Sequence, residues 1–259
     1  MKNMNTLLFV LILSGAAFAY ADDAPYESTY KPLPYTNTIF RNANIYDGDG
    51  NEFQNTDLFI RDGKIIAIGK DLPGSSDFIE IDASNKWITP GIIDIHSHMG
   101  VYPAPSVRTS SDGNEATSPV TADVWAEHSI WVQDPQFALA LKGGVTTFHV
   151  LPGSANLIGG RGVTAKNLQR NTINSMKYPN APHSLKMACG ENPKRVYGNR
   201  NQAPSTRMGN IAGYRKSWIK AEAYLSRLDE YEAKSDEAKD CLLYTSPSPR
   251  DATLSRMPS

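Results

Sequence analysis

Alternating apolar and polar residues in the first third of the chain predict short β-strands. Strand-like runs cover residues 38–46 and 58–68, and Asp-Gly pairs stand at 47–48, 49–50 and 62–63. An Asp-Gly pair between such runs is a strong hairpin signal, because both turn positions favour positive φ. The pattern therefore predicts a small β module over residues 38–88.

The pattern changes at residues 89–91, where apolar strands begin to alternate with longer polar or helical stretches. Runs at 92–98, 145–151 and 185–189 are typical of buried strands in a parallel α/β arrangement. Residues 134–141 predict a short helix, and the glycine-rich run 159–162 predicts an active-site loop. A helical stripe follows, made of Ile211, Tyr214, Trp218, Ala221, Leu225 and Leu228. We expect a second region over residues 89–240.

The first residues have the composition of a signal peptide rather than of a folded element. Lys2 precedes an apolar run at 7–13, and Ala17-Phe18-Ala19 gives a small-x-small cleavage pattern over residues 1–19. The apolar run is shorter than the roughly 20 residues that a bilayer span needs. We expect an exported protein, periplasmic or extracellular, with no membrane partner after cleavage and an extended lead-in over residues 20–37.

Composition and charge narrow the class of partner. The chain has 259 residues, is 40% hydrophobic and carries a formal net charge of -1, which is typical of a globular protein with a sizeable core. Without a run of Lys or Arg, the sequence gives no reason to expect binding to nucleic acid or to an anionic membrane. The sequence does not determine the oligomeric state.

The clearest chemical signal is the pair His96 and His98 at the end of an apolar strand. Side chains on a strand alternate between its faces, so these two imidazoles point the same way while Ile93 and Ile95 point the other way. Neutral imidazole is a good ligand for Zn²⁺ and similar ions. Taken alone, the pair is also compatible with two hydrogen-bonded histidines at a strand end.

The context of this pair resembles the amidohydrolase superfamily, in its imidazolonepropionase-like exported branch, over residues 38–240. The resemblance implies part of a (β/α)₈ TIM-type barrel, with residues 38–88 as an appended β-sandwich module. It also implies one or two divalent metal ions, with zinc as the leading candidate, at the C-terminal face of the barrel. There a metal-activated hydroxide attacks a C–N bond of a small-molecule or short peptide-like substrate. The segments that carry the resemblance are 65–69, 90–98, 143–147, 151–156, 158–160 and 186–195.

The resemblance leaves the third metal ligand open. Lys186 matches the position of a lysine that is carboxylated by CO₂ in several relatives, whereas Glu191 is the competing candidate. An unmodified lysine has three donors and no acceptor, so Lys186 requires carboxylation to bind a metal. His149, which follows the second apolar strand, is a weaker candidate for substrate binding.

The barrel that this sequence predicts is incomplete. Residues 90–240 supply about 150 residues, whereas a (β/α)₈ barrel takes about 250, and the family's later histidines and proton-shuttle aspartate have no matching positions. Residues 241–259 resemble a translated sequencing adapter, and we expect a non-native tail there. We therefore expect a fragment that is inactive alone. The alternatives are a non-catalytic binding module and the same fold with different chemistry, such as deamination or C–O cleavage.

Overall fold

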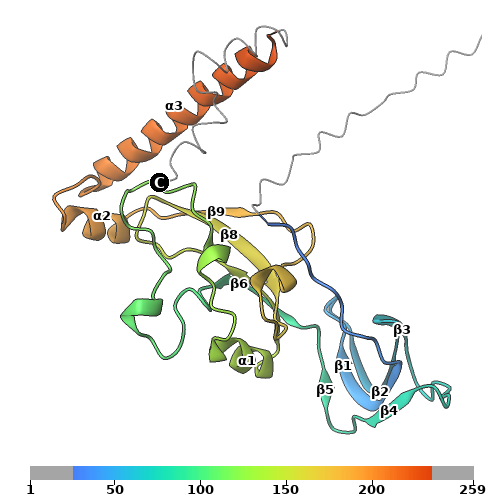
Figure 1. The fold of residues 1–259 in the computed structure, drawn as a ribbon. Helices are drawn as coiled ribbons and strands as arrows, with labels where there is room; N and C mark the ends of the chain where they lie inside the picture. Colours follow the sequence, from blue (N-terminus) through green and yellow to red (C-terminus); the bar gives the residue numbers. More distant parts are fainter. Residues whose placement is uncertain (1–25, 235–259) are drawn as a thin grey trace, which may run out of the picture.

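The computed structural model describes residues 26–234 and shows a mixed α/β chain with two sheets (Figure 1). The predicted signal peptide and the predicted non-native tail lie outside the described residues. The first sheet contains β1 (Thr38–Tyr46), β2 (Glu52–Arg61), β3 (Lys64–Gly69), β4 (Ile79–Asp82) and β5 (Trp87–Ile88). The second contains β6 (Ile92–Ser97), β7 (Val145–Val150), β8 (Ile158–Lys166) and β9 (Ser184–Met187). The helices are α1 (Pro135–Lys142), α2 (Glu191–Gly198) and α3 (Arg207–Glu232), and the short 3₁₀ turns are Arg108–Ser110, Ala126–Ser129 and Ile173–Ser175.

The β module confirms the two predicted hairpins. β1 pairs antiparallel with β2, and β2 with β3, while β4 and β5 both run parallel to β1. Asp62 and Gly63, at φ 51 and 72, form the turn between β2 and β3. The strands make one five-stranded sheet. Its buried centre consists of Ala43, Ile45, Leu58 and Ala83.

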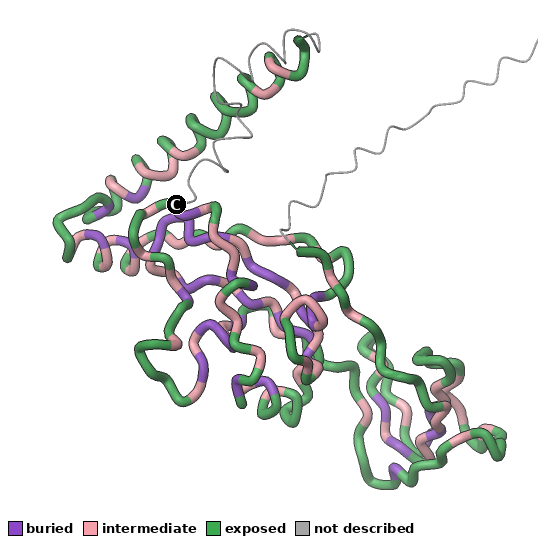
Figure 2. The backbone as a smooth tube through the Cα atoms, viewed as in Figure 1, coloured by how far each residue is buried: buried purple, intermediate pink, exposed green. Residues whose placement is uncertain are grey.

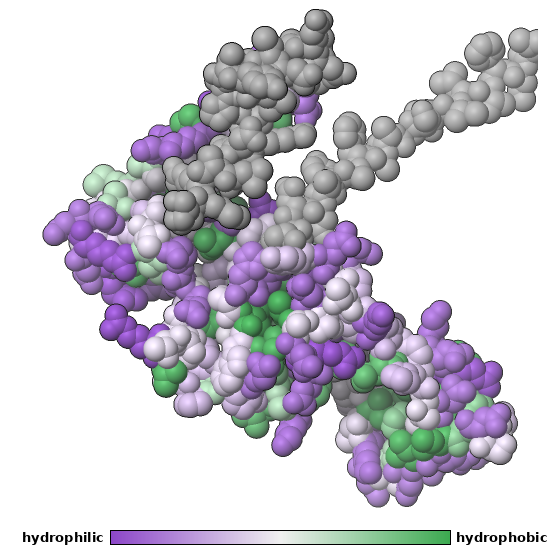
Figure 3. All heavy atoms as spheres, viewed as in Figure 1, coloured by the Kyte–Doolittle hydropathy of each residue, from purple (hydrophilic) through white to green (hydrophobic). Residues whose placement is uncertain are grey.

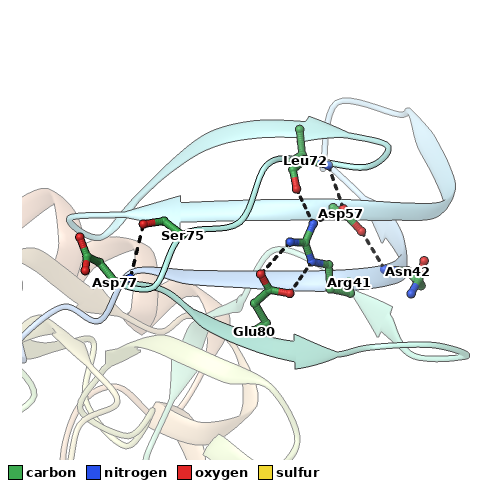
Figure 4. Close-up of polar contacts among 7 residues, drawn as sticks. All are labelled: Arg41, Asn42, Asp57, Leu72, Ser75, Asp77 and Glu80. Atoms are coloured by element: carbon green, nitrogen blue, oxygen red, sulfur yellow. Dashed lines mark hydrogen bonds and ion pairs between the residues drawn. The ribbon is translucent and has the colours of Figure 1, made fainter.

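A charged network around Arg41 ties the strands of this module together (Figure 4). The Arg41 guanidinium lies 2.7 Å from an Asp57 oxygen on β2 and 2.8 Å from a Glu80 oxygen on β4. It also donates to the carbonyl of Leu72 at 2.6 Å. Asp57 in turn accepts hydrogen bonds from the amides of Asn42 and Leu72, at 3.0 and 3.1 Å. The network therefore fixes the loop after β3 to the sheet.

The network predicts a loss of stability in acid. Burial raises the pKa of Asp57, but hydrogen bonds from the Asn42 amide, Arg41 and the Leu72 amide outweigh this effect and hold that pKa below its ordinary value. Unfolded Asp57 takes up its proton near pH about 3.9, before the folded form does. We expect the free energy of unfolding to fall as the pH drops through this window, and to fall less in Asp57→Asn. Urea denaturation at several pH values measures the free energy of unfolding of the wild type and of Asp57→Asn. The control variant Asp77→Asn, at an exposed residue, should lose as much stability in acid as the wild type does.

The second sheet departs from the predicted all-parallel arrangement at one strand. β6 and β7 are parallel, but β8 runs antiparallel to β7 and β9, so β6, β7 and β9 share one direction. The predicted loop at 159–162 is wrong, because these residues lie in β8. A side chain at Gly160 would stand 2.5 Å from Val124, whose carbonyl accepts a hydrogen bond from the Arg161 amide. The glycine therefore allows a neighbouring segment to approach the strand closely.

The main hydrophobic core lies between this sheet and α1 (Figure 2). The short helix forms where predicted, with Asp134 as its N-cap, and it packs Phe137 against Phe148 of β7 with ring centroids 5.1 Å apart. The buried members of this core are Val101, Ala126, Phe137, Phe148, Val150, Val163, Ala165 and Met176.

Helix α3 forms where predicted but projects from the body with most of its length exposed (Figures 1 and 2). Its predicted apolar stripe is not covered by described residues, since Ile211, Trp218 and Leu225 are 58%, 52% and 57% exposed. Hydrophobic residues are also exposed on the body and on the β module in the face that Figure 3 shows. Within residues 26–234, no helix has both the length and the apolar character that crossing a bilayer requires.

Candidate metal centre

Strand β6 carries the two predicted histidines to one end of the second sheet. The strand ends at the buried Ser97, and its carbonyl accepts a hydrogen bond from the Leu151 amide at 3.0 Å. The rings of His96 and His98 lie 5.2 Å apart between centroids and nearly perpendicular, at 83°. Asp94 accepts a hydrogen bond from the His96 amide at 3.1 Å and so fixes the backbone before the pair.

The hydrogen bond of His98 determines which of its nitrogens is free. His98 Nδ1 lies 2.8 Å from the carbonyl oxygen of Leu151. A carbonyl only accepts, so Nδ1 carries the proton and donates it, and the lone pair stays on Nε2. Fixing the tautomer through the second ring nitrogen is how proteins commonly orient histidine ligands.

Lys186 lies on β9, the strand at the opposite edge of the sheet from β6, and its side chain extends to His96. Its Nζ lies 3.3 Å from His96 Nε2. The charge of Lys186, followed by burial and His98, lowers the pKa of His96. Burial lowers the pKa of Lys186 itself. Both shifts favour a neutral imidazole and a neutral amine, which are the forms that donate a lone pair.

The competing candidate Glu191 lies elsewhere. It is the first residue of α2, and its side chain is 76% exposed and 3.0 Å from Arg195 Nε. The structure thus brings Lys186, and not Glu191, into contact with a histidine of the pair. Among the described residues no group of three or more His, Cys, Asp or Glu is arranged to hold a metal ion.

The donor set fits a divalent transition metal in part. Two imidazoles whose rings lie 5.2 Å apart are suitable ligand types for such an ion. A third ligand at this place requires a change in Lys186, because its ammonium form has no lone pair.

His149, the candidate for substrate binding, lies on β7 between two hydroxyl groups of the neighbouring strands. Its Nδ1 lies 2.9 Å from Thr164 Oγ1 on β8, and its Nε2 lies 2.6 Å from Ser184 Oγ on β9. Burial, and then the charge of His183, lower its pKa. Both ring nitrogens are therefore engaged between strands, and its contact with a substrate stays a prediction.

Sequence reasoning missed the role of Asp134 in holding the loop after His98. This buried carboxylate accepts hydrogen bonds from the Gly100 amide at 2.9 Å and from the Ala104 amide at 3.3 Å. It also caps α1 through the Gln136 amide at 3.0 Å. An Asp before a Pro signals a helix start, but nothing in the local sequence indicates the contact with a loop 34 residues earlier.

We expect Asp134→Ala to lower the free energy of unfolding by about 2–3 kcal/mol, since it removes a helix cap and leaves buried amides without acceptors. Thr206→Ala is the matched control, because Thr206 caps the exposed α3 through the Gly209 amide alone. It should cost about 1 kcal/mol or less. Urea denaturation compares the two, and equal losses would contradict the role of Asp134 in the loop.

Paired imidazoles at the carboxyl end of a strand, beside a lysine on a second strand of the same direction, are typical of metal-dependent hydrolases built on (β/α)₈ barrels. Comparisons with known proteins test this class. No family model matches the chain. It is 32% identical over 226 residues to amidohydrolase tasK of Hapsidospora irregularis, covering 77% of this chain and 23% of that protein. It is 44% identical over 63 residues to a dihydroorotase of Ligilactobacillus salivarius, covering 24% of this chain and 14% of that protein.

A solved structure extends the similarity to the fold. The crystal structure of an amidohydrolase from Thermotoga maritima MSB8 matches with a TM-score of 0.69 and 36% identity, over 80% of this chain and 55% of that one. The chain belongs to the amidohydrolase superfamily, which confirms the resemblance seen in its sequence. Members of this superfamily hydrolyse C–N bonds and generally use divalent metals. The chain spans 23% of the tasK protein and 55% of the Thermotoga structure.

Proposed function

We propose that the protein hydrolyses C–N bonds of small amides or short peptide-like substrates. We also propose that His96, His98 and a carboxylated Lys186 bind a divalent metal ion, with zinc as the leading candidate. The observation that carries this proposal is the 3.3 Å between Lys186 Nζ and His96 Nε2. This contact connects strands β6 and β9 at one end of the sheet, and in barrel enzymes the active site lies at the carboxyl ends of the strands. We further propose that the second sheet is part of such a barrel.

Carboxylation is the step that makes Lys186 a ligand. The neutral amine attacks the carbon of CO₂, a new N–C bond forms, and a proton leaves the nitrogen for solvent, which yields a carbamate anion. Burial lowers the pKa of Lys186 and so raises the fraction of reactive amine at a given pH. The product presents oxygen donors beside the lone pair of His96.

The chain's own residues hold and orient the site. A bound divalent cation supplies Lewis-acid activation of water and polarises a carbonyl. The hydrogen bond to Leu151 keeps His98 in one tautomer, and Asp94 fixes the backbone at His96. We assign proton transfer to no described residue. We propose that the 259-residue chain binds metal without turning over substrate.

Bicarbonate should strengthen zinc binding through Lys186. In an isothermal titration we expect affinity to rise by about tenfold to a hundredfold when bicarbonate is added, a range typical of groups that support a metal site. Lys186→Met should abolish this response, and the neighbouring surface variant Lys194→Met should keep it. A carbamate signal from ¹³C-labelled bicarbonate should be absent in Lys186→Met. A response that survives in that variant would exclude Lys186 as the third ligand.

The reaction itself is tested on the protein that the gene encodes, after the gene has been sequenced again from an independent DNA preparation. We expect amine release from N-acyl amino acids that requires zinc, stops with a chelator and is lost in His98→Ala. Turnover by the 259-residue chain would contradict the expected inactivity. Zinc binding without hydrolysis by any product of the gene would favour a non-catalytic binding module.

We also propose that residues 1–19 direct export to the periplasm or beyond. The support is the sequence pattern alone, since these residues lie outside the described part of the chain. Fractionation of expressing bacteria, with sequencing of the mature N-terminus, measures this. Retention of Met1 in a cytoplasmic protein would contradict it.

A further inference from the structure

A cavity of about 270 Å³ opens beside His98 and lies against one face of α2. His98 and Tyr102 form one side of it, the segment 153–155 another, and Asn192 and Arg195 of α2 face them. Because His98 also belongs to the candidate metal centre, a ligand in this cavity would stand next to that centre.

Arg195 gives the cavity its charge. No Asp or Glu is among the described residues that line it, and Arg195 is their only permanently charged member. The Nε of Arg195 is 3.0 Å from Glu191, but the two side chains are 59% and 76% exposed, and such exposed pairs are weak. The terminal guanidinium nitrogens have no partner within the described chain, so they are available to an anion.

Neutral polar groups surround this cation. Asn192 donates to Ser154 Oγ at 2.5 Å, which leaves the Ser154 hydroxyl hydrogen for another acceptor. The N-cap of α2 is Gly190, which makes no side-chain capping bond. The carboxylate of Glu191 in the first turn offsets the positive end of this helix, so the positive charge of the cavity comes from Arg195.

We propose that Arg195 binds a carboxylate of the substrate while the amide to be cleaved lies at His98. A guanidinium recognises a carboxylate through two parallel hydrogen bonds. Naming the ligand a substrate rests on the proposed function, but carboxylate binding does not. The preferred substrates are then N-acyl amino acids, or short peptides whose free carboxylate is close to the bond that breaks.

The test measures ligand binding to the metal-free chain by ¹⁵N NMR, with a chelator present. The probes are N-acetyl-L-alanine, its neutral counterpart N-acetyl-L-alaninamide, and inorganic phosphate. We expect the acid to shift the signals of Arg195, Asn192 and Ser154 and to bind about tenfold more tightly than the amide, as a charge-assisted pair would give.

Four variants sharpen the test. Arg195→Gln should remove the preference for the acid, and Arg195→Lys should keep part of it. Lys194→Gln, which removes a neighbouring charge outside the cavity, should bind like the wild type. Glu191→Gln should bind the acid more tightly, because it removes the negative charge beside the Arg195 guanidinium.

Equal binding of acid and amide would overturn the proposal, and so would unchanged binding in Arg195→Gln. Phosphate binding without carboxylate binding would mean that the site selects a different anion. Because no metal is present, each of these failures leaves the metal centre untouched. Conversely, a failed zinc titration leaves the carboxylate site standing.

Discussion

Glu127→Ala is expected to lower the free energy of unfolding by about 3–5 kcal/mol, the usual cost of breaking a buried ion pair. Glu127 is 1% exposed in its side chain, and its oxygen lies 2.9 Å from Nζ of Lys177, which is 6% exposed. Lys177 is the group that offsets this charge, because the other basic side chain near the carboxylate, His128, has its Nε2 4.0 Å away. The variant leaves a buried ammonium without its counterion.

The same lysine holds the lead-in to the body. Lys177 Nζ donates to the Tyr26 carbonyl, and the Lys177 carbonyl accepts from Ser28 at 2.8 Å. In Figure 1 the blue segment before β1 runs from the body to the β module. Glu127→Ala should therefore also increase proteolysis within residues 26–31.

The control for this prediction is the double variant Glu127→Leu with Lys177→Met. Replacing a buried pair with apolar residues of similar volume is often neutral or stabilising, so this variant should lie within about 1 kcal/mol of the wild type. Urea denaturation of the three proteins gives the comparison. A small loss in Glu127→Ala would mean that water reaches the carboxylate.

The sequence predicted the elements whose signals are local. Asp62-Gly63 sets positive φ at two adjacent positions, so the β2–β3 hairpin follows from a dipeptide. β8 was missed because its glycines lower strand propensity. The close approach of Val124 explains Gly160, and the approach of Ser184 and Leu151 explains Gly162. The stripe on α3 predicted a helix correctly, but periodicity does not say what covers it.

The candidate site divides in the same way. His96 lies on β6 and His98 directly follows its last residue, so the proximity of their rings follows from strand geometry. Lys186 lies 90 residues from His96, and its position came from family resemblance rather than from spacing. Glu127 and Lys177 carry no local signal, because their pairing depends on how the loop and the sheet pack.

Zinc affinity should depend on both histidines. Structural zinc sites with four ligands bind with about 10–16 kcal/mol, so each ligand accounts for about 3 kcal/mol, or more than a hundredfold in affinity. We expect His96→Ala and His98→Ala each to weaken zinc binding by at least about a hundredfold. His128→Ala is the control, since His128 lies in a 3₁₀ turn near Glu127 and its side chain is 48% exposed.

The most direct test of the account is therefore an isothermal titration of zinc into the wild-type chain, His96→Ala, His98→Ala and His128→Ala, with bicarbonate present. We expect saturable binding in the wild type and in His128→Ala, and its loss in the other two variants. Zinc binding that is unchanged in His96→Ala and His98→Ala would contradict a metal centre at the end of β6.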